Sequence, residues 1–127
     1  MLYTIFIYGS EDRVARWTPE EERDVMGRHA ALRNDLTASG RLGPVLRLTP
    51  NTVKTVKRYK ERSYVTDGPF IESKEQLMGL YVVDCASFEA AVAAAERLSF
   101  ETGVFEIAQL TWLTSGDLPP LIPDRHG

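Results

Sequence analysis

The order of the predicted elements, β-α-β-β-(β)-β-α-β, predicts an α+β sandwich of the ferredoxin-like type, in which two helices cover one face of an antiparallel sheet. Three observations support this fold class. Residues 2–8 have the β-branched and aromatic composition of a first strand, residues 18–40 carry helix signals at both ends, and a second capped helix follows a buried-looking strand at residues 77–84.

The first long helix is predicted between Thr18 and Gly40, after a polar loop at residues 9–12. Thr18 can cap the helix, Pro19 suits its first position, and Glu21 completes a capping box. Gly40 is typical of a helix terminus. Four residues share one face through their 4-3-4 spacing, namely Val25, His29, Leu32 and Leu36, with Met26 beside them.

The middle of the chain predicts further strands. Residues 44–49 and 52–59 alternate around Pro50-Asn51, which indicates a hairpin with strongly basic arms, and residues 63–66 are a candidate for another short strand. After the strand at residues 77–84, Ser87 caps the second helix. The apolar side of that helix is predicted to hold Phe88, Ala91, Val92, Ala95 and Leu98. Residues 104–112 are predicted to form the last strand.

The composition excludes several classes of protein. The chain of 127 residues is long enough for one domain, and its 15 basic against 18 acidic residues give a net charge of −3, which argues against nucleic acid as a partner. The single cysteine, Cys85, excludes an internal disulfide and fits a reducing compartment. The apolar N-terminus lacks signal-peptide features and is too short to cross a bilayer. We therefore expect a cytoplasmic protein that does not enter a membrane.

The first strand is apolar on both of its faces. The two alternating sets are Leu2, Phe6 and Tyr8 on one face and Tyr3, Ile5 and Ile7 on the other. Two helices can cover only one of them, and a bare apolar sheet face exceeds what soluble monomers tolerate. The simplest cover is a second copy packed sheet against sheet, so the sequence predicts a two-fold homodimer.

His29 replaces an aliphatic residue on the apolar face of the first helix. An imidazole in that position needs a hydrogen-bond partner, so one interpretation is a core histidine bonded to a backbone carbonyl. The other is a general acid or base, because histidine titrates near neutral pH. The sequence leaves both interpretations open.

The segment DGPF, residues 67–70, has the chemistry of a turn, in which Asp67 bonds to its own backbone and Gly68 takes a positive φ. A turn does not require Phe70, so a carboxylate presented beside an aromatic wall is also a candidate half of a pocket. If the turn folds over the first helix, Asp67 can orient His29 as the third group of a relay orients its base.

Other chemical groups carry weaker signals. The basic hairpin, with Lys54, Lys57 and Arg58, could bind an anion or nucleic acid, but lysines also protect edge strands from unwanted pairing. Cys85 is predicted to be a packed thiol and His126 to be exposed in the tail. Two histidines and one cysteine argue against a zinc site. The chain has no phosphate-binding glycine loop, G-x-S-x-G or C-x-x-C, so we expect no metal and no cofactor.

The segment YVTDGPFIESKEQLMGLYVVD, residues 64–84, is similar to the signature of the YCII-related proteins of the DGPF type. The opening YTIFIYG, the helix start TPEE and the closing strand fit the same pattern. The resemblance covers residues 1–113 and leaves residues 114–127 as a Pro-rich tail, which is expected to be extended. It implies a ferredoxin-like, dimeric α/β-barrel homodimer.

The resemblance also suggests chemistry. Some smaller YCII-like relatives carry a histidine eleven residues before a Gly-Arg-Leu, proposed to act with an aspartate, and His29 stands at that distance from Gly40-Arg41-Leu42. Asp67 belongs to the DGPF motif itself. One relative eliminates chloride from a chlorinated hydroxyquinone. Other DGPF proteins are linked to extracytoplasmic-function sigma factors.

We therefore predict one small-molecule pocket per subunit, between the first helix and the sheet and partly closed by the DGPF turn. The predicted activity is cofactor-free acid–base chemistry (elimination, isomerisation or cyclisation, thus a lyase or isomerase), with His29 as base and Asp67 as its orienter or the acid. The alternative is a non-catalytic ligand-binding or regulatory module. Aromatic candidates for the pocket wall, each of which could equally be core, are Tyr3, Phe6, Tyr8, Phe70 and Tyr81.

Overall fold

A computed structural model describes residues 1–119 as an α+β fold with one main antiparallel sheet. The elements are β1 (Leu2–Gly9), α1 (Glu11–Ala15), α2 (Pro19–Ala38), β2 (Leu42–Arg47), β3 (Lys54–Tyr59), β4 (Arg62–Asp67), β5 (Gln76–Asp84), α3 (Phe88–Leu98) and β6 (Val104–Gln109). The main sheet has the order β2-β5-β1-β6, and β3 and β4 form a separate ribbon. Without that ribbon the order is that of a ferredoxin-like sandwich, which confirms the predicted fold class.

Helix α2 begins with the predicted capping box. The hydroxyl oxygen of Thr18 accepts the backbone N–H of Glu21 at 3.1 Å, and the carboxylate of Glu21 accepts the backbone N–H of Thr18 at 3.0 Å. Two donors that a helix start leaves unpaired are thereby satisfied. At the other end Gly40 has φ +69°, a conformation that suits glycine. The predicted ends of this helix are therefore confirmed.

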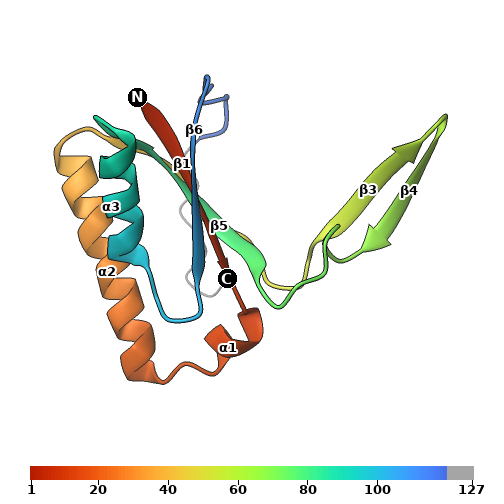
Figure 1. Ribbon diagram of the computed structural model, residues 1–127, viewed down its shortest axis with the longest axis horizontal. Helices are drawn as coiled ribbons and strands as arrows, with labels where there is room; N and C mark the ends of the chain where they lie inside the picture. Colours follow the sequence, from red (N-terminus) through yellow and green to blue (C-terminus); the bar gives the residue numbers. More distant parts are fainter. Residues whose placement is uncertain (120–127) are drawn as a thin grey trace.

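The core lies between the sheet and the two long helices, which both lie on one side of it (Figure 1). The odd-numbered residues of β1 point to the helices, since Tyr3, Ile5 and Ile7 are buried. Helix α2 contributes Leu32 to this core. Helix α3 contributes Ala91, Ala94, Ala95 and Leu98. The even-numbered apolar residues of β1 are half-buried on the opposite face, as the alternation predicted.

The predicted hairpin of residues 44–49 and 52–59 is wrong. Strand β2 pairs with the central strand β5, with Leu46 opposite Leu80, whereas β3 pairs with β4 around a turn at residues 60–61. The alternation of apolar and polar residues identifies a strand but does not determine which strand it pairs with. The apolar β2 is stabilised more by pairing with β5 in the buried sheet than by pairing with the basic β3.

The β3–β4 ribbon forms an arm that leaves the main sheet on the side away from α2 and α3 (Figure 1). Even the apolar pair at its centre is exposed, with Val56 at 66% and the opposite Val65 at 61%. A two-stranded ribbon with no covered face is marginally stable by itself. The arm therefore has little apolar burial within one chain.

Residues 11–15 form the short helix α1 where a loop was predicted, because the hydroxyl of Ser10 caps it by accepting the N–H of Arg13 at 3.3 Å. The last strand ends at Gln109, earlier than predicted, and residues 110–119 form no helix or strand. His126 and the tail beyond residue 119 lie outside the described residues. No helix within residues 1–119 is long and apolar enough to cross a membrane.

Candidate functional site

His29 belongs to a chain of three polar side chains between α2 and β5. Its Nδ1 lies 2.7 Å from the hydroxyl of Tyr81, and Arg33 Nη1 donates to the same hydroxyl at 3.3 Å. Tyr81 faces the helices because it pairs with Ile5 in the sheet register, and it is 1% exposed. His29 and Arg33 are four residues apart on α2 and therefore lie on one face. The imidazole is thus held by a side chain rather than by a backbone carbonyl.

The hydrogen-bond pattern assigns the proton positions of this chain. Arg33 can only donate, so the Tyr81 oxygen accepts from it and can donate its own hydrogen to His29 Nδ1. This leaves the imidazole hydrogen on Nε2. Within residues 1–119 Nε2 has no hydrogen-bond partner, yet it is not among the buried unpaired atoms, so solvent reaches it. The ring therefore offers an N–H group to anything that binds beside it.

The surroundings keep both rings uncharged at neutral pH. Burial, and then the positive charges of Arg33 and Arg28, lower the pKa of His29 to about 4. Burial raises the pKa of Tyr81, against the opposing effect of Arg33. A neutral imidazole of low basicity is a hydrogen-bond donor or a proton donor in a relay. It is a weak general base near pH 7, because a base works best with a pKa near the working pH.

The structure does not bring Asp67 to His29 within one chain. Asp67 ends β4 at the base of the arm, where its carboxylate accepts from Lys54 Nζ at 2.6 Å and its side chain is 88% exposed. The backbone N–H of Gly68 donates to the carbonyl of Val53 at 2.7 Å, which ties the DGPF turn to the residue just before β3. The turn therefore directs the chain back towards β5 and does not fold over α2 (Figure 1).

The five aromatic residues predicted to line one pocket lie in three places. Tyr3 and Tyr81 are buried on the helix side of the sheet, and only Tyr81 contacts the polar chain. Phe6 and Tyr8 are half-buried on the opposite face. Phe70 is 70% exposed beyond the arm. One chain does not place these five side chains around a common cavity.

Comparison with known proteins assigns the chain to a family. A model of the YCII-related domain matches residues 1–113. The chain belongs to the YCII-related family. A protein of Rhizobium meliloti (strain 1021) named "Uncharacterized protein R00369" is 39% identical over 123 residues, which cover 94% of this chain and 99% of that protein. The resemblance expected from residues 64–84 is thereby confirmed.

In this YCII-related chain the sequence prediction missed Arg33 and the direct partnership of Tyr81 with His29. The spacing in the sequence could have predicted Arg33, because it follows His29 by one helical turn and therefore lies on the same face of the helix. The partnership with Tyr81 depends on the register of β5 against β1, which the sequence does not show. Among residues 1–119 no group of three or more His, Cys, Asp or Glu side chains could hold a metal ion.

The lowered pKa of His29 predicts a pH-dependent stability. The folded ring has a pKa of about 4 and the unfolded ring about 6.5, so in this interval the unfolded chain binds the proton and the folded chain does not. The free energy of unfolding therefore falls as the pH is lowered from 6.5 to 4, by about 2 kcal/mol once the partial exposure of the ring is allowed for. Urea unfolding at pH 7 and pH 4 measures this loss.

His29→Gln is the matched variant for this measurement, because glutamine can still accept from Tyr81 but does not titrate. Carboxylates titrate in both proteins, so the wild-type loss minus the variant loss isolates His29. An equal loss in both proteins would show that the folded ring has an ordinary pKa.

Proposed function

We propose that the chain is a cytoplasmic, cofactor-independent enzyme that polarises the oxygen of a small carbonyl or quinone-like compound through His29. The observation that supports this proposal is the polar chain Arg33–Tyr81–His29, which ends in a solvent-reached Nε2–H on a ring held neutral. A buried, fully connected chain of this kind fixes the ring orientation before a ligand arrives. Elimination, isomerisation and cyclisation are the reactions that need only such proton movements.

In the proposed step, protons move along the chain of Tyr81 and His29 to the substrate. Nε2–H moves to the substrate oxygen, the Tyr81 hydroxyl hydrogen moves to Nδ1, and the Tyr81 oxygen takes a negative charge beside the Arg33 guanidinium. Water accepts the proton from the carbon next to the carbonyl and becomes hydronium. On return the carbon takes a proton from solvent, the substrate oxygen gives its proton back to Nε2, and Nδ1 gives its proton back to the Tyr81 oxygen. His29 is therefore the proton donor of this step rather than the general base predicted from sequence, and Arg33 stabilises the charge that develops on Tyr81.

Hydrogen–deuterium exchange tests this function without knowledge of the natural substrate. A panel of small ketones, hydroxyquinones and chlorinated hydroquinones is incubated with the full chain in D₂O, and loss of the C–H signal is followed by proton NMR. We expect at least one compound to exchange faster with the wild type than with His29→Leu. Binding of compounds without faster exchange would overturn the proposal and favour the non-catalytic binding module.

We also propose that the functional unit is a homodimer that covers the second face of the sheet. The strand registers place Phe6, Leu80 and Leu46 in a row across β1, β5 and β2 on that face. Leu46 is 44% exposed, and Val104 on β6 is 48% exposed. A second copy would bury this row and could also contact the arm, whose two faces are exposed in the part of the chain that the structure describes.

Sedimentation velocity tests the dimer. Leu46→Lys places an ammonium group in the proposed interface, and we expect it to raise the dimer Kd at least about tenfold, because a buried unpaired charge is costly. Met26→Lys adds the same charge at a residue of α2 that is 51% exposed and should leave the Kd unchanged. Monomeric wild type at micromolar concentration, or equal effects of the two lysines, would count against this interface.

A further inference from the structure

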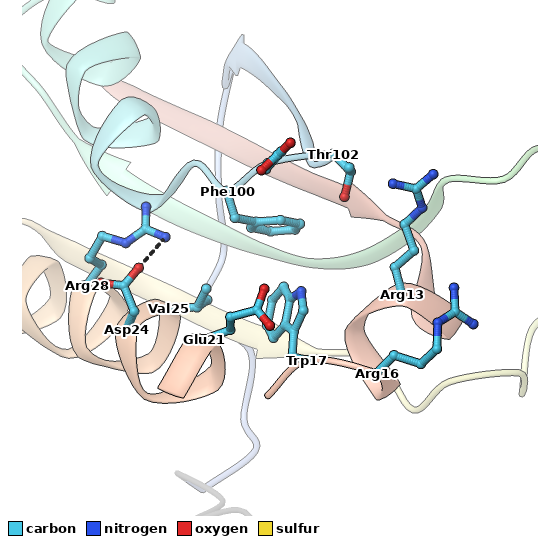
Figure 2. A pocket seen from close by; sticks show the side chains of 10 residues that line it. Arg13, Arg16, Trp17, Glu21, Asp24, Val25, Arg28, Phe100 and Thr102 are labelled. Atoms are coloured by element: carbon cyan, nitrogen blue, oxygen red, sulfur yellow. Dashed lines mark ion pairs between the residues drawn. The ribbon is translucent and has the colours of Figure 1, made fainter. Parts of the chain in front are cut away.

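A separate pocket lies between α1, the first turns of α2 and the loop that joins α3 to β6 (Figure 2). Its volume is about 520 Å³, which is within the range of small-molecule sites. None of His29, Arg33 and Tyr81 lines it, although Arg28, the residue before His29, does. The pocket is thus distinct from the proposed catalytic site, and its interpretation is independent of the proposed function.

Two aromatic rings form the inner wall of this pocket. Trp17 and Phe100 meet edge to face, with centroids 5.3 Å apart and planes at 82°. Phe105 packs on Phe100 in the same manner at 5.6 Å. A Cβ on Gly103 would come within 2.7 Å of the Phe100 ring, so the backbone closes tightly on this ring. The wall is therefore preformed and apolar, as a site for a ring or short hydrocarbon requires.

Some of the charged side chains around this wall are already paired with other groups of the chain. Arg28 bonds to Asp24 at 3.2 Å and donates to the carbonyl of Ser99, and the carboxylate of Glu21 is used in the helix cap. Within residues 1–119, three charged side chains that line the pocket have no ion pair, namely Arg13, Arg16 and Glu101. Figure 2 shows these two arginines together at the α1 end of the pocket.

Thr102 marks the rim of the pocket with an unusual backbone. Its φ is +71°, in the left-handed region that a β-branched residue rarely adopts. Figure 2 shows its hydroxyl turned towards the space above Trp17. Strained residues of this kind cluster at ligand-binding sites, and here the strain lies beside the apolar wall and the unpaired arginines.

We infer that this pocket binds a small aromatic anion, whose carboxylate or phosphate pairs with Arg13 and Arg16 while its ring contacts Trp17 and Phe100. Guanidinium groups bind both anions through paired N–H donors. A cationic ligand is disfavoured because Asp24 is already paired with Arg28 and Glu21 is held in the helix cap, which leaves Glu101 against two arginines. The ligand class therefore follows from the excess of positive charge among the lining side chains that have no ion pair within residues 1–119.

Tryptophan emission provides a direct readout. The chain has two tryptophans, so Trp112, which is 73% exposed, is first replaced in a Trp112→Phe background. This protein is titrated with benzoate, phenyl phosphate and the uncharged benzyl alcohol at constant ionic strength in buffer without phosphate. We expect saturation with at least one anion at a Kd below about 1 mM, and at least tenfold weaker binding of the alcohol.

Variants of the arginines test whether Arg13 and Arg16 bind the anion. The exposed pair is changed together in Arg13→Gln/Arg16→Gln, which should weaken anion binding at least tenfold. Arg23→Gln removes the same charge from an exposed residue of α2 outside the pocket and should bind within twofold of its parent. Thermal melts verify that each variant is folded. No saturation with either anion, equal binding of the alcohol, or full binding by the double variant would each overturn the inference.

Discussion

Replacement of His29 by leucine is expected to slow the enzyme-catalysed hydrogen–deuterium exchange by about 10²–10³, the usual loss when one donor to a developing oxyanion is removed. Leucine suits the apolar face of α2, and Arg33 still donates to the Tyr81 hydroxyl, so the fold should remain intact. The expected loss is in the exchange rate at saturating compound, because the Nε2–H group matters most once charge develops on the oxygen.

Two further variants test whether His29 exchanges its proton with Tyr81 or with Asp67. His29→Gln keeps an amide donor but cannot pass a proton between its two ends, so its rate should fall between those of the wild type and His29→Leu. Asp67→Asn should exchange within about twofold of the wild type, because Asp67 pairs with Lys54 on the exposed arm. If Asp67→Asn lost as much activity as His29→Leu, the partner of His29 during reaction would be that carboxylate, supplied by a second copy, rather than Tyr81.

Truncation of Leu32 to alanine is expected to lower the free energy of unfolding by about 3 kcal/mol. Leu32 is 1% exposed and packs in the same core cluster as Tyr81, one turn of α2 beyond His29. The loss combines the transfer free energy of the removed carbons with the cavity that they leave. Denaturant titrations at a fixed protein concentration, which removes any effect of dimerisation, measure the change.

Met26→Ala is the control for this truncation, because Met26 lies on the same helix and is 51% exposed. Methionine and alanine are both good helix formers, so the change should stay within about 0.5 kcal/mol. Similar losses for the two variants would mean that α2 packs through a different face from the one described.

Local signals in the sequence predicted the elements whose ends are chemically marked. Helix α2 begins at a capping box and ends before a glycine, and both features act over a few residues. Ser87 marks the start of α3 in the same way, since its hydroxyl accepts the N–H of Ala90 at 3.1 Å. Helix α1 carries a comparable cap at Ser10, but its five residues are too few for a hydrophobic period to appear.

Strand partners and the candidate site could not be predicted in the same way. The alternation of residues 52–59 is compatible with β2 or β4 as a neighbour, and only the buried sheet decides between them. The choice of strand partner has a direct effect on the site, because it leaves Asp67 at the base of the arm, where it pairs with Lys54 rather than with His29. Tyr81 could be predicted as an inward-facing aromatic, whereas its contact with His29 depends on how α2 lies over β5.

The proposed function requires that His29 be a neutral imidazole that carries its hydrogen on Nε2 and accepts from Tyr81 at Nδ1. Long-range ¹H–¹⁵N correlation spectra of the imidazole, recorded from pH 3.5 to pH 8, report both the tautomer and the pKa. We predict the Nε2–H tautomer throughout the neutral range and a pKa of about 4, rising in Arg33→Gln as one positive charge is removed. A pKa near 6.5 in the wild type, or a hydrogen on Nδ1 at pH 7, would contradict this assignment of the His29 protons.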